Sequence, residues 1–411
     1  MRRRDFLKSA GAAGAALATT AAWTPTGRAG SRRAGSEPSA DPAEQGLPAL
    51  PDETFRRRRD RAARLMSQGD FDALFAEPST NFEYLTGANL GRSERLIALI
   101  LTADGVATIV APEFEVERVS RAVRAVPDVR GWAEQADPYR LVADVLSKRR
   151  PGAIGIEPRA RFGVVQRMKA VLPRWRVNGA EPLFTRLRII KSEEELTLIR
   201  RAISITDTSI AATFAALRPG VTDREVAERL SREMRERGAP GGGLVQFGPT
   251  SALPHGGTEG RQLEYGMPVL IDCGCRVHGY TSDITRMRFF GDEPGADYRE
   301  VFNTVLSAQT AAYEAARPGM EAQALDRIAR QVITEAGYGQ HFTHRLGHGL
   351  GMDGHEPPYL VQGNTRTIEP GMVFTIEPGI YLPERWGVRI EDDFVVRETG
   401  LEPLSTRVAP L

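Results

Sequence analysis

Five residues in the second half of the chain are of types that bind divalent metal ions in proteins. They are Asp272, Asp283, His348, Glu377 and Glu391. The turn-forming Gly279 between the aspartates, and the segment 383–387 between the glutamates, predict that each acidic pair lies on one hairpin. Four carboxylates so close would repel one another unless a cation compensated them. Hard divalent ions prefer such oxygen ligands, and the histidine shifts the preference towards Mn, Fe, Co or Zn.

An internal repeat indicates that these acidic residues meet in the fold. The nonapeptide GMPVLIDCG, which contains Asp272, matches GMVFTIEPG, which contains Glu377, at an offset of 105 residues. The other matched features are Arg-Pro-Gly at 218–220 with 317–319, the helical patterns after them, and Asp283 with Glu391. One carboxylate alone is more often part of a surface salt bridge. Four matched features at a nearly constant offset instead predict two similar halves about a pseudo-two-fold axis, each supplying two carboxylates.

Five short segments resemble the metal-site segments of the pita-bread metallopeptidases, the family of methionine aminopeptidases, prolidases and Xaa-Pro aminopeptidases. These segments are 269–274, 279–286, 344–351, 375–379 and 388–392. The resemblance is strong over about residues 185–405 and weaker before them, where it rests on 81–87. It implies a creatinase-like α/β N-terminal domain followed by an α+β pita-bread catalytic domain with an internal pseudo-two-fold repeat.

The resemblance also implies how the ligands divide between two divalent metal ions, with Mn as the first choice and Co, Zn or Fe as alternatives. Asp272 and Asp283 would bind one ion, and Asp283, His348 and Glu377 would complete the pair, with Glu391 bridging. A water between two such ions has its pKa lowered enough to be hydroxide at neutral pH, while one ion polarises a carbonyl. The implied chemistry is hydrolysis of a peptide bond.

Four further residues match the family's pattern around this centre. They are His255, His344, His355 and Arg389. His255 matches a histidine that contacts the substrate backbone, and His355 matches one that faces the scissile peptide. Glu377 is expected to carry the proton to the leaving nitrogen. His344 and Arg389 resemble extra residues of the proline-specific branch, and Arg389 is expected to orient Glu391 and Asp283 rather than to bind a substrate carboxylate.

The predicted substrate is therefore a small peptide with proline at its second position, cleaved by an Xaa-Pro aminopeptidase or dipeptidase. Because a proline nitrogen carries no hydrogen, the site must accept a ring where other peptidases expect a donor. A homodimer is expected from the resemblance alone.

The alternative functions are those of a metal-free creatinase-type hydrolase, a carbon–sulfur lyase on the same scaffold, and a non-catalytic binding module descended from a peptidase. The presence of all five ligand residues disfavours each alternative.

The elements that must position these residues divide into two domains. Alternating strand-like and helical runs predict an α/β domain over residues 52–185. Its predicted elements are strands at 73–76, 96–101 and 107–110, a helix at 113–126, and a turn at 84–87. The catalytic domain is predicted at 186–411, and its first helix should begin at a capping box formed by Ser192 and Glu195.

The first 29 residues predict a twin-arginine export signal. Residues 3–8 resemble the RRxFLK motif, and the Ala/Gly-rich stretch at 10–23 is too short to span a bilayer comfortably. Gly27-Arg28-Ala29 offers a cleavage site; the alternative is a disordered basic N-terminus. Residues 30–51 are rich in Ser, Gly and Pro, which predicts a flexible linker. The mature protein is expected to be periplasmic or secreted, with no stable membrane insertion.

The composition argues against a protein that binds nucleic acid through general electrostatic attraction. The chain has 54 basic and 53 acidic residues, so its formal net charge is only +1. The one basic run, at 56–59, predicts a solvated helix face. Cys273 and Cys275 are too few for a disulfide framework and too close in one strand to bridge without strain, so they are expected to be packing residues.

Overall fold

The computed structural model describes residues 49–411 except 70 and 258. The predicted export signal, and the predicted linker up to residue 48, lie outside the described residues. Within the described part of the chain, no helix is long and apolar enough to cross a membrane.

The N-terminal half forms the predicted α/β domain around a six-stranded sheet with the strand order β4-β3-β2-β1-β5-β6. The strands are β1 (Ala73–Ala76), β2 (Ala98–Thr102), β3 (Ala107–Pro112), β4 (Asp128–Trp132), β5 (Ala153–Ile156) and β6 (Arg176–Gly179). The helices are α1 (Asp52–Ser67), α2 (Thr80–Thr86), α3 (Val116–Ala122), α4 (Pro138–Leu146), α5 (Phe162–Val171) and α6 (Glu181–Arg188). The three predicted strands are confirmed. The predicted helix at 113–126 is shorter than expected, since a 3-10 turn over Glu113–Glu115 precedes α3.

The predicted turn at 84–87 is wrong, because these residues end helix α2. Ser79 caps the helix by accepting a hydrogen bond from the backbone N–H of Phe82 at 3.2 Å. Gly87 ends it with a φ of 72°, the left-handed conformation that glycine adopts without strain. The turn-like composition therefore marks a helix end.

The prediction of a solvated basic face at 56–59 is correct for Arg56 and Arg57 but wrong for Arg58 and Arg59, which are buried. Arg59 donates to the backbone carbonyl of Leu85 at 2.6 Å. Arg58 donates to the Tyr84 carbonyl at 3.1 Å, to Glu195 at 3.1 Å and to the Tyr280 hydroxyl at 2.6 Å. These two side chains point from α1 into the protein, where a guanidinium can satisfy several buried acceptors at once.

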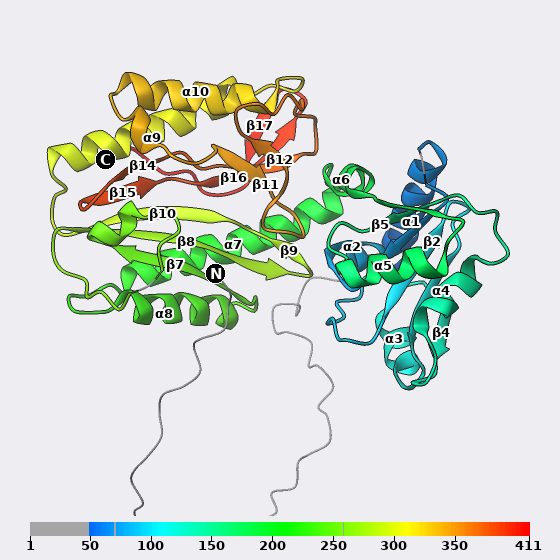
Figure 1. Ribbon diagram of the computed structural model, residues 1–411. Helices are drawn as coiled ribbons and strands as arrows, with labels where there is room; N and C mark the ends of the chain where they lie inside the picture. Colours follow the sequence, from blue (N-terminus) through cyan, green and yellow to red (C-terminus); the bar gives the residue numbers. More distant parts are fainter. Residues whose placement is uncertain (1–48, 70, 258) are drawn as a thin grey trace, which may run out of the picture. The chain divides into compact units, whose positions relative to one another are not determined.

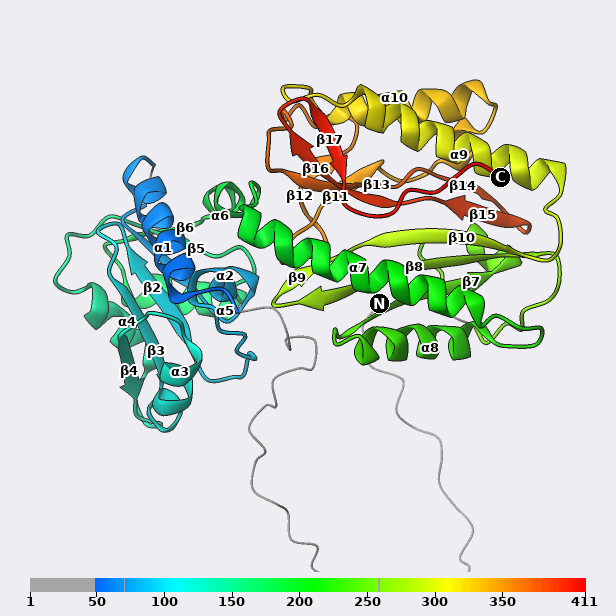
Figure 2. The same ribbon diagram turned by 180° about the vertical axis from the view of Figure 1, so that it is seen from behind.

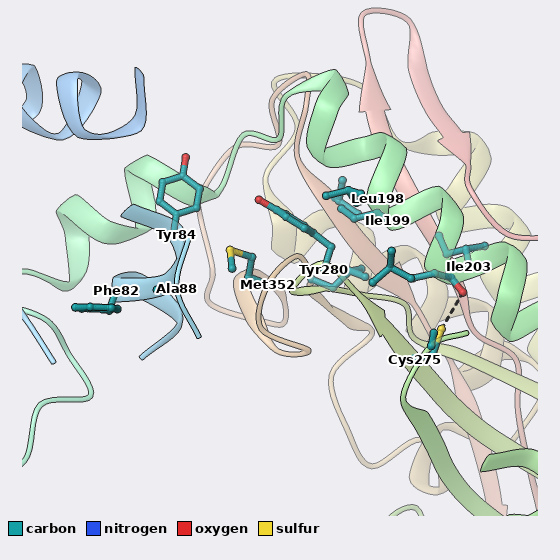
Figure 3. Close-up of a cluster of buried hydrophobic side chains, with 14 of the residues drawn as sticks. Phe82, Tyr84, Ala88, Leu198, Ile199, Ile203, Cys275, Tyr280 and Met352 are labelled. Carbon is teal, nitrogen blue, oxygen red and sulfur yellow. Dashed lines mark hydrogen bonds between the residues drawn. The ribbon is translucent and has the colours of Figure 1, made fainter. Parts of the chain in front are cut away.

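Figure 3 shows Tyr84 and Tyr280 within a cluster of buried hydrophobic side chains. The Arg58 guanidinium lies 4.1 Å from the centroid of the Tyr84 ring. Phe82, Ile199, Ile203 and Met352 belong to the same cluster, so its apolar side chains come from both halves of the chain. Cys273 and Cys275 are buried and free, as predicted. The Cys275 thiol donates to the backbone carbonyl of Ala202 at 3.2 Å.

The C-terminal half contains two sheets, each with a pair of helices packed against it (Figures 1 and 2). The first unit consists of α7 (Glu193–Ala215), α8 (Asp223–Glu236), β7 (Gly241–Phe247), β8 (Met267–Val277), β9 (Tyr280–Thr281) and β10 (Ile284–Phe290). The second consists of α9 (Ala296–Ala315), α10 (Ala322–Glu335), β11 (Gly347–Gly349), β12 (Glu356–Leu360), β13 (Val373–Ile376), β16 (Asp392–Arg397) and β17 (Gly400–Pro403). A separate hairpin is formed by β14 (Gly379–Leu382) and β15 (Trp386–Arg389). Helix α7 begins at the predicted capping box of Ser192 and Glu195.

Each unit of the C-terminal half thus repeats a helix pair followed by an antiparallel sheet, as the sequence repeat predicts. The units meet at a bridge between Thr285 and Glu391. Next to it, Arg286 donates to the Glu391 carbonyl at 2.6 Å and to Asp392 at 2.7 Å. The partly buried Arg286 guanidinium therefore links the two sheets beside the strand ends that carry the predicted ligands.

Candidate metal centre

Strand pairing carries the predicted acidic ligands to corresponding places in the two sheets. Asp272 lies in β8 opposite Thr285 of β10, and Asp283 stands directly before β10. Glu377 directly follows β13, and Glu391 directly precedes β16, the partner of β13. Because the Thr285–Glu391 bridge joins the sheets at this point, the acidic pairs converge on one place.

His348 reaches the same place from β11, where glycines on both sides allow a close approach of neighbouring strands. A Cβ atom on Gly347 would lie 2.0 Å from the carbonyl oxygen of Thr375, and one on Gly349 would lie 2.4 Å from that of Pro357. No larger residue fits at either position without moving the backbone. The Gly-His-Gly sequence is thus a packing requirement of the strand that presents the histidine.

The ligand atoms of the predicted residues form three overlapping groups, and within each group all of these atoms lie within 4.8 Å of one another. The groups are Asp272 with Asp283 and Glu391, His348 with Glu377 and Glu391, and Asp283 with His348 and His355. All five predicted ligands are therefore brought together. Glu391 belongs to both groups that consist only of predicted ligands, and the third group adds His355, which was not predicted as a ligand.

The orientation of the His348 ring fits a metal ion. Its Nδ1 lies 3.2 Å from the Gly349 carbonyl, which can only accept, so Nδ1 carries the proton and Nε2 has a free lone pair. Nε2 faces Glu377 Oε1 at 3.3 Å and Asp283 Oδ2 at 3.7 Å. Burial, together with the neighbouring His355, lowers the pKa of His348 to about 3, so the ring is neutral. Lone pairs that face one another in this way are satisfied by a cation between them.

The acidic side chains are poorly solvated, which strengthens their need for a counter-charge. Burial raises the pKa of Glu377 to about 8, although the Arg389 cation opposes the shift. Burial and then neighbouring carboxylates raise the pKa of Asp283 and Glu391 well above their ordinary values. Carboxyls of this kind exchange their protons for divalent cations at neutral pH.

Arg389 begins a directed chain of hydrogen bonds beside the carboxylates. It donates to Asp272 Oδ2 at 2.5 Å, to the Thr285 hydroxyl at 3.1 Å and to the Tyr381 hydroxyl at 2.8 Å. Its direct carboxylate partner is thus Asp272, whereas we expected Glu391 and Asp283. It reaches Glu391 only through Thr285, whose hydroxyl donates to Glu391 at 2.6 Å.

His344 receives the other end of this chain. Its Nδ1 donates to the Arg345 carbonyl at 2.7 Å, so Nε2 accepts from the Tyr381 hydroxyl at 2.8 Å. Burial lowers the pKa of His344 to about 4 and raises that of Tyr381 to about 12, so both groups are neutral at neutral pH. Hydrogen-bond donation therefore runs from Arg389 through Tyr381 to His344.

His355 stands at the exposed side of the centre with its ring centroid 3.8 Å from that of His348. Arg345 lies with Nη2 3.2 Å from His355 Nδ1, and because a guanidinium can only donate, this contact leaves the ring proton on Nε2. Burial, followed by the Arg345 charge, lowers the pKa of His355. His255 is exposed on the loop after η3 (Gly248–Ala252), and the preceding Pro254 carbonyl accepts from Arg389 at 3.4 Å.

Sequence reasoning missed three residues of this site, namely Thr285, Arg345 and Tyr381. Thr285 and Arg345 lie inside segments used for the family resemblance, and the position of Thr285 opposite Asp272 could have identified it. Tyr381 lies four residues after Glu377 in an otherwise apolar strand. Only the packing of the β14–β15 hairpin brings its hydroxyl between Arg389 and His344.

Comparisons with known proteins match both halves of the chain. Residues 197–398 match the model of metallopeptidase family M24, and residues 58–190 match the creatinase/prolidase N-terminal domain. An uncharacterized peptidase of Staphylococcus aureus (strain MW2) is 37% identical over 340 residues, which cover 81% of this chain and 94% of that protein.

Solved structures with the same fold include three peptidases. Dipeptidase PepE from Mycobacterium ulcerans has a TM-score of 0.82 and 35% identity, covering 88% of this chain and 98% of that one. A recombinant prolidase from Thermococcus sibiricus has a TM-score of 0.80 and 32% identity, with coverages of 87% and 98%. The Xaa-Pro dipeptidase from Bacillus anthracis has a TM-score of 0.77 and 29% identity, with coverages of 86% and 98%. The two-domain fold, the convergent ligands and these similarities together show that the chain belongs to metallopeptidase family M24, with a creatinase-type N-terminal domain before a pita-bread catalytic domain.

Proposed function

We propose that this metallopeptidase hydrolyses the bond between an N-terminal residue and a following proline, with two divalent metal ions at the centre. The observation that carries the proposal is that the two groups made only of predicted ligands, Asp272 with Asp283 and Glu391, and His348 with Glu377 and Glu391, share Glu391. One carboxylate shared between two ligand groups supports two adjacent binding positions bridged by Glu391, and the neutral Nε2 lone pair of His348 suits Mn, Co, Zn or Fe.

The charge of the site also favours two ions. The four predicted acidic ligands carry four negative charges when ionised, and Arg389, which pairs directly with Asp272, offsets one of them. One divalent ion would leave a net negative charge in a poorly solvated site. Two would leave a single positive charge, which favours the approach of a nucleophile and of a polarised carbonyl oxygen.

The protein groups around the ions have separate tasks in this reaction. When bound, the two ions would polarise the scissile carbonyl and acidify the attacking water. His355 would donate a hydrogen bond from Nε2–H to the substrate oxygen that gains negative charge. Glu377 would take the proton from the water and deliver it to the proline nitrogen, which has no hydrogen of its own. Arg389 and Thr285 would hold Asp272 and Glu391 in place.

We propose a dipeptide as the preferred substrate because of Arg345. In the part of the chain that the structure describes, no carboxylate lies within ion-pair distance of Arg345, whose guanidinium lies 4.7 Å from the centroid of the Tyr359 ring and contacts His355. The carboxylate of a dipeptide lies only about 3–4 Å from the scissile carbonyl carbon, which is within reach of a group beside His355. The names of the related dipeptidases and the prolidase agree with this choice.

The test is hydrolysis of Ala-Pro, Ala-Pro-Ala and Ala-Ala by purified protein before and after chelation, with metal content measured alongside. We expect two ions per chain, cleavage of Ala-Pro that stops on chelation and returns with Mn, and slow cleavage of Ala-Ala. Arg345→Ala should raise the KM for Ala-Pro more than that for Ala-Pro-Ala, whereas the exposed Arg366→Ala should change neither. Equal rates on Ala-Ala and Ala-Pro would refute the proline specificity, and one ion per active chain would refute the dinuclear site.

We also propose export by the twin-arginine route. The RRDFLK sequence at 3–8 supports it, because paired arginines before an apolar stretch are the feature that this route reads. Replacing Arg3 and Arg4 by lysine should retain the protein in the cytoplasm in a cell-fractionation experiment. An unchanged distribution would refute the export signal.

A further inference from the structure

The segment that carries His355 has no strand partner of its own. Residues 351–355 form consecutive bends between β11 and β12, and the ladder of β12 begins only at Glu356. At the start of the segment the Thr281 N–H of β9 donates to the Gly351 carbonyl at 2.8 Å, and the hydrogen bond from the Gly351 N–H to the Asp353 carbonyl at 3.1 Å is local. The position of the His355 ring must therefore be set by side chains that anchor the residues on either side of it.

Two carboxylates flank His355, and one guanidinium binds both. Arg188, the last residue of α6, donates through Nη2 to Asp353 Oδ2 at 2.7 Å and also to Glu356 Oε2. Its other nitrogen, Nη1, donates to the side-chain carbonyl of Asn81 in α2 at 3.0 Å. The Arg188 side chain is only 10% exposed, so these contacts replace water almost completely. A single residue thus joins the N-terminal domain to both ends of the tetrapeptide 353–356, which includes His355.

Each carboxylate has a second cationic partner, which completes the anchor. Lys191 donates to Glu356 Oε1 at 2.9 Å, and its side chain is 2% exposed. Arg159 donates to Asp353 Oδ1 at 2.9 Å from the N-terminal domain. In addition, Asn81 donates to Glu157 Oε2 at 3.3 Å, so the network continues to the end of β5. Three cations therefore compensate the two carboxylates, and no net negative charge remains at the anchor.

Packing holds only one end of the His355 segment, because Met352 is buried in the hydrophobic cluster whereas His355 is exposed. A pocket of about 160 Å³ borders it, and the pocket lining includes Asn81, Arg188, Asp353, His355 and Glu356. The segment could move into this space if the ion pairs were weakened. On that side Arg188 is the residue that binds both Asp353 and Glu356.

We propose that Arg188 is a positioning residue, which acts through Asp353 and Glu356 to hold His355 in its catalytic orientation. Through this residue the creatinase-type domain contributes to catalysis without touching the metal centre. The inference rests on the proposed function, because it takes His355 to be the group that faces the substrate. A guanidinium is required, since an ammonium in its place can keep the charge but cannot bind Asp353, Glu356 and Asn81 together.

The test is a double-mutant cycle between Arg188→Lys and His355→Ala, measured as kcat and KM for Ala-Pro with metal content checked in each variant. In the wild-type background Arg188→Lys should lower kcat by about tenfold or more with little change in KM, because a misplaced catalytic group costs turnover. In the His355→Ala background the same change should cost less than about twofold, because its target is absent. An equal loss in both backgrounds, or no loss in either, would overturn the proposal.

Arg58→Lys is the matched control. Arg58 is also a buried arginine that binds three acceptors and pairs with a glutamate, Glu195, but it makes no contact with the His355 segment. Arg58→Lys should lower the melting temperature without changing kcat in either the wild-type or the His355→Ala background. If Arg188→Lys does not fold, Asp353→Asn replaces it in the cycle and should show the same dependence on His355.

A second readout separates this inference from the proposed function. In the metal-free, 15N-histidine-labelled protein, the His355 ring signal can be assigned by its loss in His355→Ala. Arg188→Lys should shift or broaden this signal and leave that of the remote His341 unchanged. An unshifted His355 signal would refute the positioning role even if Ala-Pro is cleaved. A shifted signal in a protein that does not cleave Ala-Pro would refute only the proposed function.

Discussion

Removing the metal ions should make the stability of the protein fall as the pH rises from 6.5 to 8. The reason is Glu377, whose pKa is raised by burial from 4.5 to about 8 in the absence of a cation. Between these values the folded protein holds a proton that the unfolded chain has released. Stability from such a group is fully present below pH 4.5 and is lost as the pH rises through 8.

Between pH 6.5 and 8 the contribution of Glu377 to the pH dependence of stability is separate from that of the buried histidines. The pKa of His344 is lowered to about 4 and that of His348 to about 3, so their contribution to stability is present above pH 6.5 and lost only as the pH falls. Across 1.5 pH units, Glu377 alone should remove roughly 2 kcal/mol of unfolding free energy, at about 1.4 kcal/mol per unit. Asp283 and Glu391 act in the same direction.

The measurement is thermal unfolding of chelator-stripped protein at pH 6.5, 7.0, 7.5 and 8.0. A loss of 2 kcal/mol corresponds to a fall in melting temperature of roughly 4–8 °C for a domain of this size. Reloading Mn should abolish the slope, because bound cations keep the carboxylates ionised throughout. Glu377→Gln should reduce the slope of the stripped protein to the part contributed by Asp283 and Glu391, while the exposed Glu369→Gln should preserve it. A stripped wild-type protein whose melting temperature stays level or rises over this window would refute the assignment of the cluster as a cation site.

Four substitutions test individual tasks at the centre. His348→Ala should lose bound metal and activity together, and full metal content by elemental analysis would remove His348 from the ligand set. His355→Ala should keep both ions while turnover falls by about 10²–10⁴, the range for an acid–base or hydrogen-bonding group; loss of metal would make it a ligand instead. Arg345→Ala removes a cation that lowers the pKa of His355, so the pH at which the His355 ring takes up a proton, followed by NMR, should move higher, and a move to lower pH would contradict that role. Tyr381→Phe should reduce kcat by about tenfold without loss of metal, because it breaks the chain from Arg389 to His344; unchanged kinetics would show that this chain is structural.

The residues that converge on the centre could be predicted from sequence because their spacing follows the backbone. Asp272 and Glu377 occupy the same place in two copies of one strand pattern, and pairing then fixes where Asp283 and Glu391 lie. The capping box at Ser192 is equally local, since its two hydrogen bonds join residues three apart. Strand alternation and helix caps are set within about ten residues, so one sequence is enough to reveal them.

The residues that sequence reasoning missed or misjudged make contacts that depend on how distant elements pack. Arg58 is one of four consecutive arginines, and nothing in that run distinguishes it from Arg57. Its burial follows from the approach of Tyr84 and Tyr280, which lie 26 and 222 residues away. The role of Tyr381 was missed for the same reason. A tyrosine in an apolar strand does not reveal which arginine and histidine its hydroxyl will contact.

Buried arginines share one structural role across these sites. Arg58, Arg188 and Arg389 each donate to at least three groups, and each joins elements that are distant in the chain. A guanidinium stays charged when buried and offers five donors in a fixed plane, so it can orient several acceptors together. A metal centre built from carboxylates at the ends of separate sheets needs such cross-links, because the ligands repel one another until the ions bind. Arg389 serves this need at the ligands themselves, and Arg188 extends the same principle to the loop that presents His355 to the substrate.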